Sequence, residues 1–181
     1  MKLIEFDGLE FKIADEALLV RPIRELFEKD KTKKKENFWK QMSYLWFMVD
    51  PRSTYQYLVD ENKRSEEIIA QEGLGKDWQP SFELREAMDI YRKHTVTTAS
   101  LLLEDMRNGV DALRSMLRAF GSVEISDGKA AAQVASSLTA TIAKIPELMK
   151  AMADAEKALA KDFASEDIAR GSAVKAIGED L

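Results

Sequence analysis

Polar and apolar residues alternate over the first 13 positions of the chain. The apolar positions on either side of Asp7-Gly8 are Leu3, Ile4, Phe6, Leu9, Phe11 and Ile13. Asp-Gly between alternating hydrophobic residues is a strong hairpin signal, because both central residues of a type I′ turn need a positive φ. The pattern predicts a β-hairpin over residues 2–13, which must pack on another element because a lone hairpin is marginal in water.

Two helices are expected next, on either side of a lysine-rich link. Pro22 suits the first position of a helix, and we expect one from Pro22 to about Lys29. Over residues 36–49, apolar residues recur every three or four positions and cover nearly the whole helix circumference. Such a helix is buried on all sides, in a core or in an interface. The aromatic core or interface candidates are Phe38, Trp39, Tyr44, Trp46 and Phe47.

The aromatic helix is expected to end at a sharp corner at Asp50-Pro51. Asp is favoured as a helix cap and Pro as the first helical residue, so a new helix is predicted over residues 51–72. Ser53 with Gln56 offers an alternative start, because this pair fits a capping box two residues later. Residues 73–80 (GLGKDWQP) indicate a loop.

The rest of the chain is expected to form long helices. The apolar spacing predicts one uninterrupted helix over residues 81–120, although Gly109 weakens that pattern. Residues 121–128 are turn-rich and have glycine at both ends. Residues 129–164 are rich in alanine, and Pro146 is expected either to divide them into two helices, 129–144 and 146–164, or to bend a single one.

An apolar seam with heptad spacing runs through residues 134–163 and needs a partner helix. Its apolar members are Leu138, Ile142, Ile145, Met149, Met152, Leu159 and Phe163, and its one polar member is Glu156. The polar tail over residues 165–181 is expected to fray.

These elements predict an all-α fold with a small N-terminal β-hairpin and long C-terminal helices. All but one of the aromatic residues precede residue 121, so the core is expected in the first part of the chain. We therefore expect a hairpin and an aromatic-rich helical body over residues 1–120. Residues 121–181 are expected to form an alanine-rich helical arm or a second helical layer.

Composition removes most enzyme classes. The 181 residues include no cysteine and one histidine, which excludes thiol catalysis and any metal site that needs two histidines. That histidine, His94, has no nearby carboxylate to orient it as a general base. We expect no catalytic residues, no cofactor, no metal and no small-molecule substrate. The apolar runs are also too short to span a bilayer, so no membrane contact is expected.

Charge gives limited support for nucleic-acid binding. The net charge is −5, whereas a dedicated nucleic-acid binder is typically basic. The link over residues 29–35 nevertheless contains five lysines, which form either a solvated loop or a phosphate-binding surface. The candidate phosphate contacts are Lys31, Lys33, Lys34 and Lys35.

Residues 73–76 (GLGK) are similar to the end of a phosphate loop. Such a loop needs a glycine five positions before its second glycine and a hydroxyl residue after the lysine. Ala70 and Asp77 occupy those positions. A helix that ends at a glycine and is followed by a loop explains this segment better.

The stretch from Ile13 to Arg64 resembles a family of small virion proteins of tailed phages, especially crAss-like phages and relatives that infect Bacteroidetes. The shared features are a strand-like piece, a proline followed by an aliphatic helix that ends at Asp30-Lys31, a lysine-rich link and an aromatic helix. That helix leads into the corner Met48-Val49-Asp50-Pro51-Arg52-Ser53-Thr54-Tyr55. Thr54 stands where the family commonly has proline.

The resemblance implies a structural role in the neck or head–tail connector of a virion, after synthesis in the bacterial cytoplasm. Such proteins are mostly helical and form rings of about twelve copies that join the portal to the tail. The implied partners are copies of the chain itself, the portal and other neck or tail proteins, with packaged DNA as a further candidate. The alternatives are a helical adaptor that binds another protein through residues 134–163, and a DNA-contacting protein that uses Lys29–Lys35.

The resemblance brings no catalytic residues with it. It implies that Asp50 and Ser53 fix the corner as caps. Arg52 and Tyr55 are expected either to hold the corner by a hydrogen bond or stacking contact, or to face a neighbouring subunit. Pro51 completes the set of corner or interface candidates.

Overall fold

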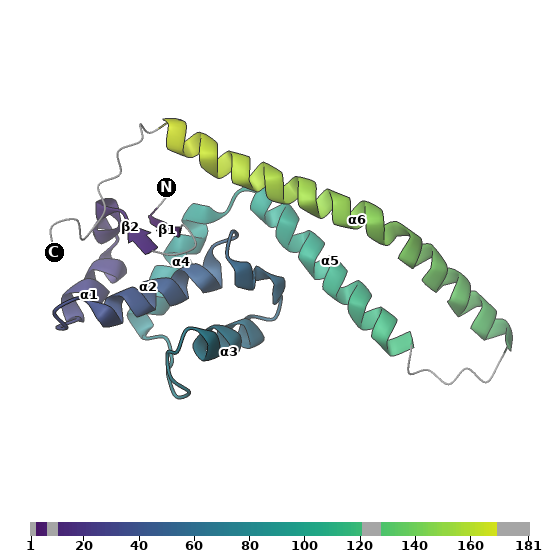
Figure 1. The fold of residues 1–181 in the computed structure, drawn as a ribbon, viewed down its shortest axis with the longest axis horizontal. Helices are drawn as coiled ribbons and strands as arrows, with labels where there is room; N and C mark the ends of the chain where they lie inside the picture. The colour runs from purple at the N-terminus through teal and green to yellow at the C-terminus, as the bar shows by residue number, and fades with distance from the viewer. Residues whose placement is uncertain (1–2, 7–10, 121–127, 170–181) are drawn as a thin grey trace. The chain divides into compact units, whose positions relative to one another are not determined.

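The computed structural model describes residues 3–6, 11–120 and 128–169, and their fold is all-α as predicted (Figure 1). The chain opens with two short strands, β1 (Ile4–Phe6) and β2 (Phe11–Ile13). The helices that follow are α1 (Arg21–Lys29), α2 (Glu36–Val49), α3 (Glu61–Gln71), α4 (Phe82–Thr95), α5 (Thr98–Phe120) and α6 (Gly128–Ala169). Two short 3₁₀ helices cover Asp15–Leu19 and Thr54–Tyr57.

The chain divides into two compact units, and each contains a hydrophobic cluster of its own. The described residues of unit 1 are 3–6, 11–96 and the end of α6 over 164–169, and those of unit 2 are 97–120 and 128–163. In this division α5 belongs with most of α6. The division inferred from the sequence, at residue 120, instead groups α5 with the aromatic-rich body.

The predicted hairpin is present, and β1 and β2 pair antiparallel. A two-residue turn at Asp7-Gly8 would pair Phe6 with Leu9, but the observed register pairs Phe6 with Phe11. The two-residue turn is therefore wrong, and residues 7–10 themselves lie outside the described part of the chain. The fully buried side chains of this segment are Leu3, Ile4 and Ile13. They belong to the same cluster as the buried helix residues of unit 1, so the hairpin packs on the helices as expected.

The structure confirms the first two predicted helices. α1 begins at Arg21, one residue before Pro22, and α2 has the predicted bounds. The buried side chains of α2 are Phe38, Met42, Tyr44, Leu45, Trp46, Phe47, Met48 and Val49. α3 and α4 both pack against α2, and α1 packs against α4. The aromatic helix is thus the centre of the core of unit 1.

The predicted helix over residues 51–72 is wrong, because the chain forms two separate helical segments there. Thr54–Tyr57 is a 3₁₀ helix capped by the Ser53 side chain. The Asp60 carboxylate caps α3 and accepts hydrogen bonds from two backbone N–H groups of its first turn, at 2.9 and 3.2 Å. Ser and Asp side chains that bond the nearby backbone compete with a continuous helix, so each cap starts a new segment.

The predicted uninterrupted helix over residues 81–120 is also wrong. It is broken after Thr95, and Gly109 lies inside α5. The Thr97 Oγ1 accepts a hydrogen bond from the Ser100 N–H at 3.1 Å, and the Ser100 Oγ accepts one from the Thr97 N–H at 2.8 Å. This reciprocal arrangement is a capping box in which serine replaces the usual Glu or Gln. It starts α5 and so ends the continuity with α4.

α6 is a single helix of 42 residues with Pro146 inside it, so the division into two helices is wrong and the one-helix alternative is confirmed. Pro146 has no N–H to donate to the Ile142 carbonyl. Both residues are exposed, so water can bond that carbonyl. α6 continues to Ala169, which corrects the predicted start of the frayed tail, and residues 170–181 lie outside the described part.

In unit 2, α5 and α6 form a helical hairpin whose two helices pack against each other at one end. α5 and α6 lie together near the start of α5 and diverge towards its C-terminal end (Figure 1). The buried side chains where the two helices pack are Leu103, Ala155, Leu159 and Phe163. Arg107 and Glu156 form an ion pair beside them at 3.5 Å.

The predicted seam of α6 is only partly covered. Leu159 and Phe163 are buried, and Leu138, Ile145 and Met152 are half-buried. Ile142 and Met149, by contrast, are 50% and 56% exposed. Ile142 and Met149 therefore face solvent in this chain, whereas the other five apolar members of the seam are at least partly covered.

We expect Trp46→Ala to lower the free energy of unfolding by about 3–5 kcal/mol. The indole is buried and packs edge-on against Phe11 and Phe47, with ring centroids 5.8 and 5.3 Å away. Urea unfolding followed by circular dichroism measures the change. The control is Phe82→Ala, at a side chain that is 71% exposed, which should cost less than about 0.5 kcal/mol. A cost below about 1 kcal/mol for Trp46→Ala would contradict the core assignment.

Candidate functional site

The predicted corner is built around the buried carboxylate of Asp50. Its Oδ1 accepts hydrogen bonds from the Arg52 N–H and Nε, at 2.9 and 2.8 Å. Its Oδ2 accepts from Arg52 Nη2 at 2.7 Å and from the Tyr91 hydroxyl at 2.6 Å. Asp50 is fully buried, and a buried charge is tolerated only when it is paired and hydrogen-bonded. The corner therefore holds a bidentate ion pair that is closed by a tyrosine from α4.

This cluster keeps Tyr91 protonated. Burial raises the pKa of Tyr91 well above its usual value, and the adjacent Asp50 carboxylate raises it further, while Arg52 opposes the rise less strongly. For Arg52, burial favours the neutral guanidine, but the bonds to Asp50 outweigh it and the pKa is raised. Tyr91 thus acts as a hydrogen-bond donor and Arg52 as a fixed cation.

Side chains after the corner bond the last carbonyls of α2. Such carbonyls have no partner within a helix. The Ser53 hydroxyl donates to the Phe47 carbonyl at 2.8 Å. Gln56 Nε2 and Arg64 Nη1 both donate to the Met48 carbonyl, at 3.1 and 3.0 Å. The end of α2 is therefore fixed by three polar side chains from the following segments.

The structure changes the roles expected at the corner. Asp50 is the C-cap residue of α2 and not the N-cap of a following helix, because its carboxylate is occupied by Arg52 and Tyr91. Ser53 is the cap, since its Oγ accepts from the Tyr55 N–H at 3.2 Å. Pro51 lies in the turn between α2 and Ser53.

Of the two contacts expected of the corner residues, Arg52 makes the hydrogen bond, and Tyr55 makes both a hydrogen bond and a ring contact. The Tyr55 hydroxyl donates to Glu72 Oε1 at 2.7 Å, and its ring lies edge-on to Phe47 with centroids 5.0 Å apart. Burial and the Glu72 carboxylate both raise the pKa of Tyr55. The side chains of the corner are therefore bonded within unit 1.

The five aromatic candidates belong to one core. Phe38, Tyr44, Trp46 and Phe47 are buried, and Trp39 is half-buried. Tyr44 packs against Trp78, with ring centroids 4.6 Å apart, and its hydroxyl shares a 2.7 Å hydrogen bond with the Ser65 Oγ. Their place in the core leaves little of these rings for stacking on a nucleic-acid base.

The lysine-rich link is held by its own lysines. Lys35 has a left-handed backbone, with φ of 53°, and its Nζ donates to the carbonyls of Phe27 and Asp30 at 3.0 and 2.7 Å. Lys31 Nζ donates to the Glu28 carbonyl at 2.9 Å. Two of the four candidate phosphate contacts thus bind the C-terminal end of α1. The other two, Lys33 and Lys34, are exposed.

Asp30 is a structural residue that the sequence reasoning missed. Its Oδ1 accepts from the Thr32 N–H and hydroxyl, at 2.9 and 2.8 Å, and its Oδ2 accepts from the Phe38 N–H at 2.9 Å. Burial opposes ionisation, but hydrogen bonds from Phe38 and Thr32 outweigh it and lower the pKa of Asp30 to about 2. The Asp-x-Thr sequence is a local turn signal that points to part of this arrangement.

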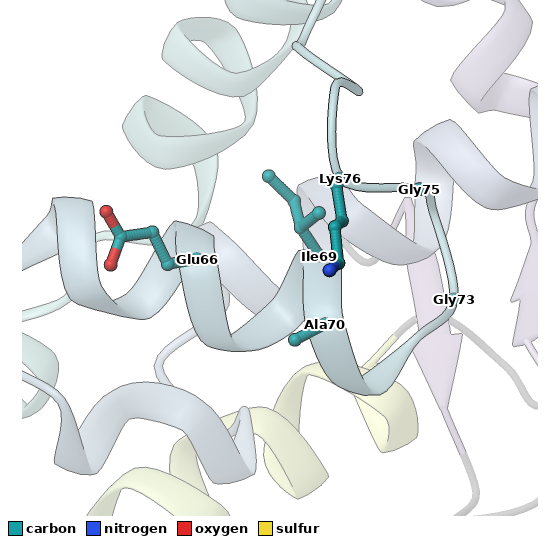
Figure 2. A pocket seen from close by; sticks show the side chains of 6 residues that line it. All are labelled: Glu66, Ile69, Ala70, Gly73, Gly75 and Lys76. Atoms are coloured by element: carbon teal, nitrogen blue, oxygen red, sulfur yellow. The ribbon is translucent and has the colours of Figure 1, made fainter.

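The GLGK segment borders a shallow hollow on α3 (Figure 2). The hollow has a volume of about 490 Å³ and is lined by Glu66, Ile69, Ala70, Gly73, Gly75 and Lys76. Gly73 and Gly75 have φ of 64° and 98°, values that glycine adopts readily. The segment follows a helix and not a strand, as expected for a helix end and a loop.

Comparisons with known proteins and a search for ion or membrane sites add no assignment. We find no match to a protein-family model, to a curated protein or to a solved structure. Within the described ranges, no three His, Asp or Glu side chains are grouped so that they would hold a metal ion. No helix among those residues is long and apolar enough to cross a membrane.

We expect Asp50→Ala to lower the free energy of unfolding by about 3 kcal/mol, because it leaves Arg52 and Tyr91 without their shared acceptor. The matched control is Asp60→Ala, which removes an exposed helix cap and should cost about 1 kcal/mol. Urea unfolding of both variants gives the comparison. Equal losses in the two variants would show that Asp50 acts as a simple cap.

The lowered pKa of Asp30 predicts a pH dependence of stability. A carboxyl group with a lower pKa in the folded state stabilises the fold above its unfolded-state pKa, near 4. That contribution is lost as the pH falls from about 4 to about 2. We expect Asp30→Asn to be less stable at pH 7 and to lose less stability than the unchanged chain over this acid range. Urea midpoints measured at pH 7, 4 and 3 test the prediction, and parallel profiles for the two chains would contradict it.

Proposed function

We propose that this chain is a non-enzymatic structural protein of a phage virion, and a subunit of the neck or head–tail connector ring. The observation that carries the proposal is the exposed apolar surface of unit 2. Among the described side chains of α5 and α6, five large apolar ones are about half exposed, namely Leu101, Leu102, Met116, Ile142 and Met149. Exposed apolar side chains that gather on one element mark contact surfaces for other proteins.

Unit 1 supports the proposal through its internal order. The corner that carries the family resemblance is held by a buried ion pair, and the apolar helix before it is covered by α3 and α4. A ring subunit needs a body that keeps its shape while neighbours assemble on it. On this proposal the chain is made in the bacterial cytoplasm and contacts copies of itself, the portal and other neck or tail proteins.

One observation favours a second candidate function, that of a helical adaptor. Ile142 and Met149 belong to the seam over residues 134–163, and both are about half exposed. A different protein that presents an apolar helix would fit that row. The alternative of DNA contact has less support, because Lys31 and Lys35 bond backbone carbonyls of α1 and of the link.

The ring assignment predicts a defined large assembly. We expect light scattering of the assembled protein to give one discrete mass, near that of about a dozen subunits. We also expect mass spectrometry to detect the chain in virions purified on a density gradient. The adaptor function would be favoured if the chain is missing from purified virions and instead forms a one-to-one complex with one cellular protein.

A further inference from the structure

The middle of α6 is covered on one side only. α5 has 23 residues and α6 has 42, and every described side chain of α6 over residues 135–154 is half-buried or exposed. The stretch over residues 130–143 also contains no charged residue. A helix surface that faces water usually carries charged and polar residues. This part of α6 is therefore suited to packing against another helix.

A groove lies between α5 and α6, beside the middle of α6. It has a volume of about 360 Å³ and is lined by Leu113 of α5 and by Ala140, Thr141, Lys144 and Leu148 of α6. Gly109 and Met116 lie one turn from Leu113 on α5. Met116 is 54% exposed, and a Cβ added at Gly109 would meet no atom within 4 Å. The apolar wall of the groove therefore continues along α5 into open space.

The charges beside the groove complement a second copy of α6. Lys144 lines the groove, and Glu147 lies three residues later on the same side of the helix. When two α6 helices run antiparallel about the midpoint between residues 145 and 146, Lys144 of each copy faces Glu147 of the other. The same register places Ala140 of each copy beside Ala151 of the other, and small side chains allow a close approach. A single two-fold axis thus brings two pairs of opposite charges together and places small side chains where the two helices meet.

We infer that this groove binds α6 of a second copy of this chain, so that the free protein is a two-fold symmetric dimer. The inference rests on the proposed function in that both assign assembly to unit 2. It goes further by naming the partner and the register. A contact of this kind closes after two copies, whereas a ring needs a different, head-to-tail contact. The dimer is therefore a form of the free subunit, in which the groove is covered before assembly.

A charge-reversal series on the full chain tests the register. The dissociation constant is measured by sedimentation equilibrium for the unchanged chain, for Lys144→Glu, for Glu147→Lys and for the double variant. Each single change turns two attractive pairs into two repulsive ones, so we expect the dissociation constant to rise about tenfold or more. The double variant restores both pairs with the signs exchanged, and it should regain most of the affinity.

The control is Lys157→Glu, which makes the same charge change at an exposed position of α6 outside the groove. It should leave the dissociation constant within about twofold, and circular dichroism checks that all variants keep their helix content. A dimer that tolerates both single reversals, or an unchanged chain that stays monomeric at every concentration, would overturn the inference. A free chain that forms only a ring of about a dozen subunits would overturn it too, while supporting the proposed function.

Discussion

A buried carboxylate must accept hydrogen bonds from donor groups of the protein, because water cannot reach it. The fold of unit 1 depends on the donors that surround Asp50. Arg52, two residues later, supplies the cation, and Tyr91 supplies a hydroxyl from α4, which is distant in sequence. Asp30 acts similarly at the other end of α2, where it accepts the Phe38 N–H. α2 is apolar on nearly all sides, so hydrophobic burial alone leaves its rotation poorly determined. The two carboxylates supply the directional contacts that fix the helix in the core.

The sequence predicted the elements whose signals are local. Apolar spacing located α1 and α2, and alternation located the hairpin. The two helices that were predicted too long show where such reasoning fails, because the apolar pattern continues across each break. What ends the helices is side-chain capping at Ser53, Asp60 and Thr97, and a cap competes with helix continuation through geometry that spacing does not reveal. At Pro146 the opposite happened, since a residue that usually interrupts a helix lies inside α6.

The corner was located correctly from sequence, but its chemistry was not. Asp50 was expected to cap a helix, and nothing near it in sequence indicated Tyr91, whose hydroxyl is its most distant partner. The lysine-rich link was likewise located from sequence, but its contacts were not predicted. A run of lysines suggests a surface for phosphate, yet Lys35 turns back to the carbonyls that end α1. A contact between residues that are tens of positions apart, or between a side chain and a backbone atom, produces no pattern of residue spacing. Sequence reasoning therefore does not detect it.

The capping box of Thr97 and Ser100 affects which parts of the chain can unfold locally. A continuous helix would share one hydrogen-bond ladder between the two units, whereas the box ends that ladder between α4 and α5. Regions with few buried apolar side chains open at lower free energy, and they do so as separate cooperative segments. The cluster of unit 2 is far smaller than that of unit 1. We therefore expect the amide protons of α5 and of α6 up to Phe163 to exchange with solvent through local openings that leave those of α2 protected.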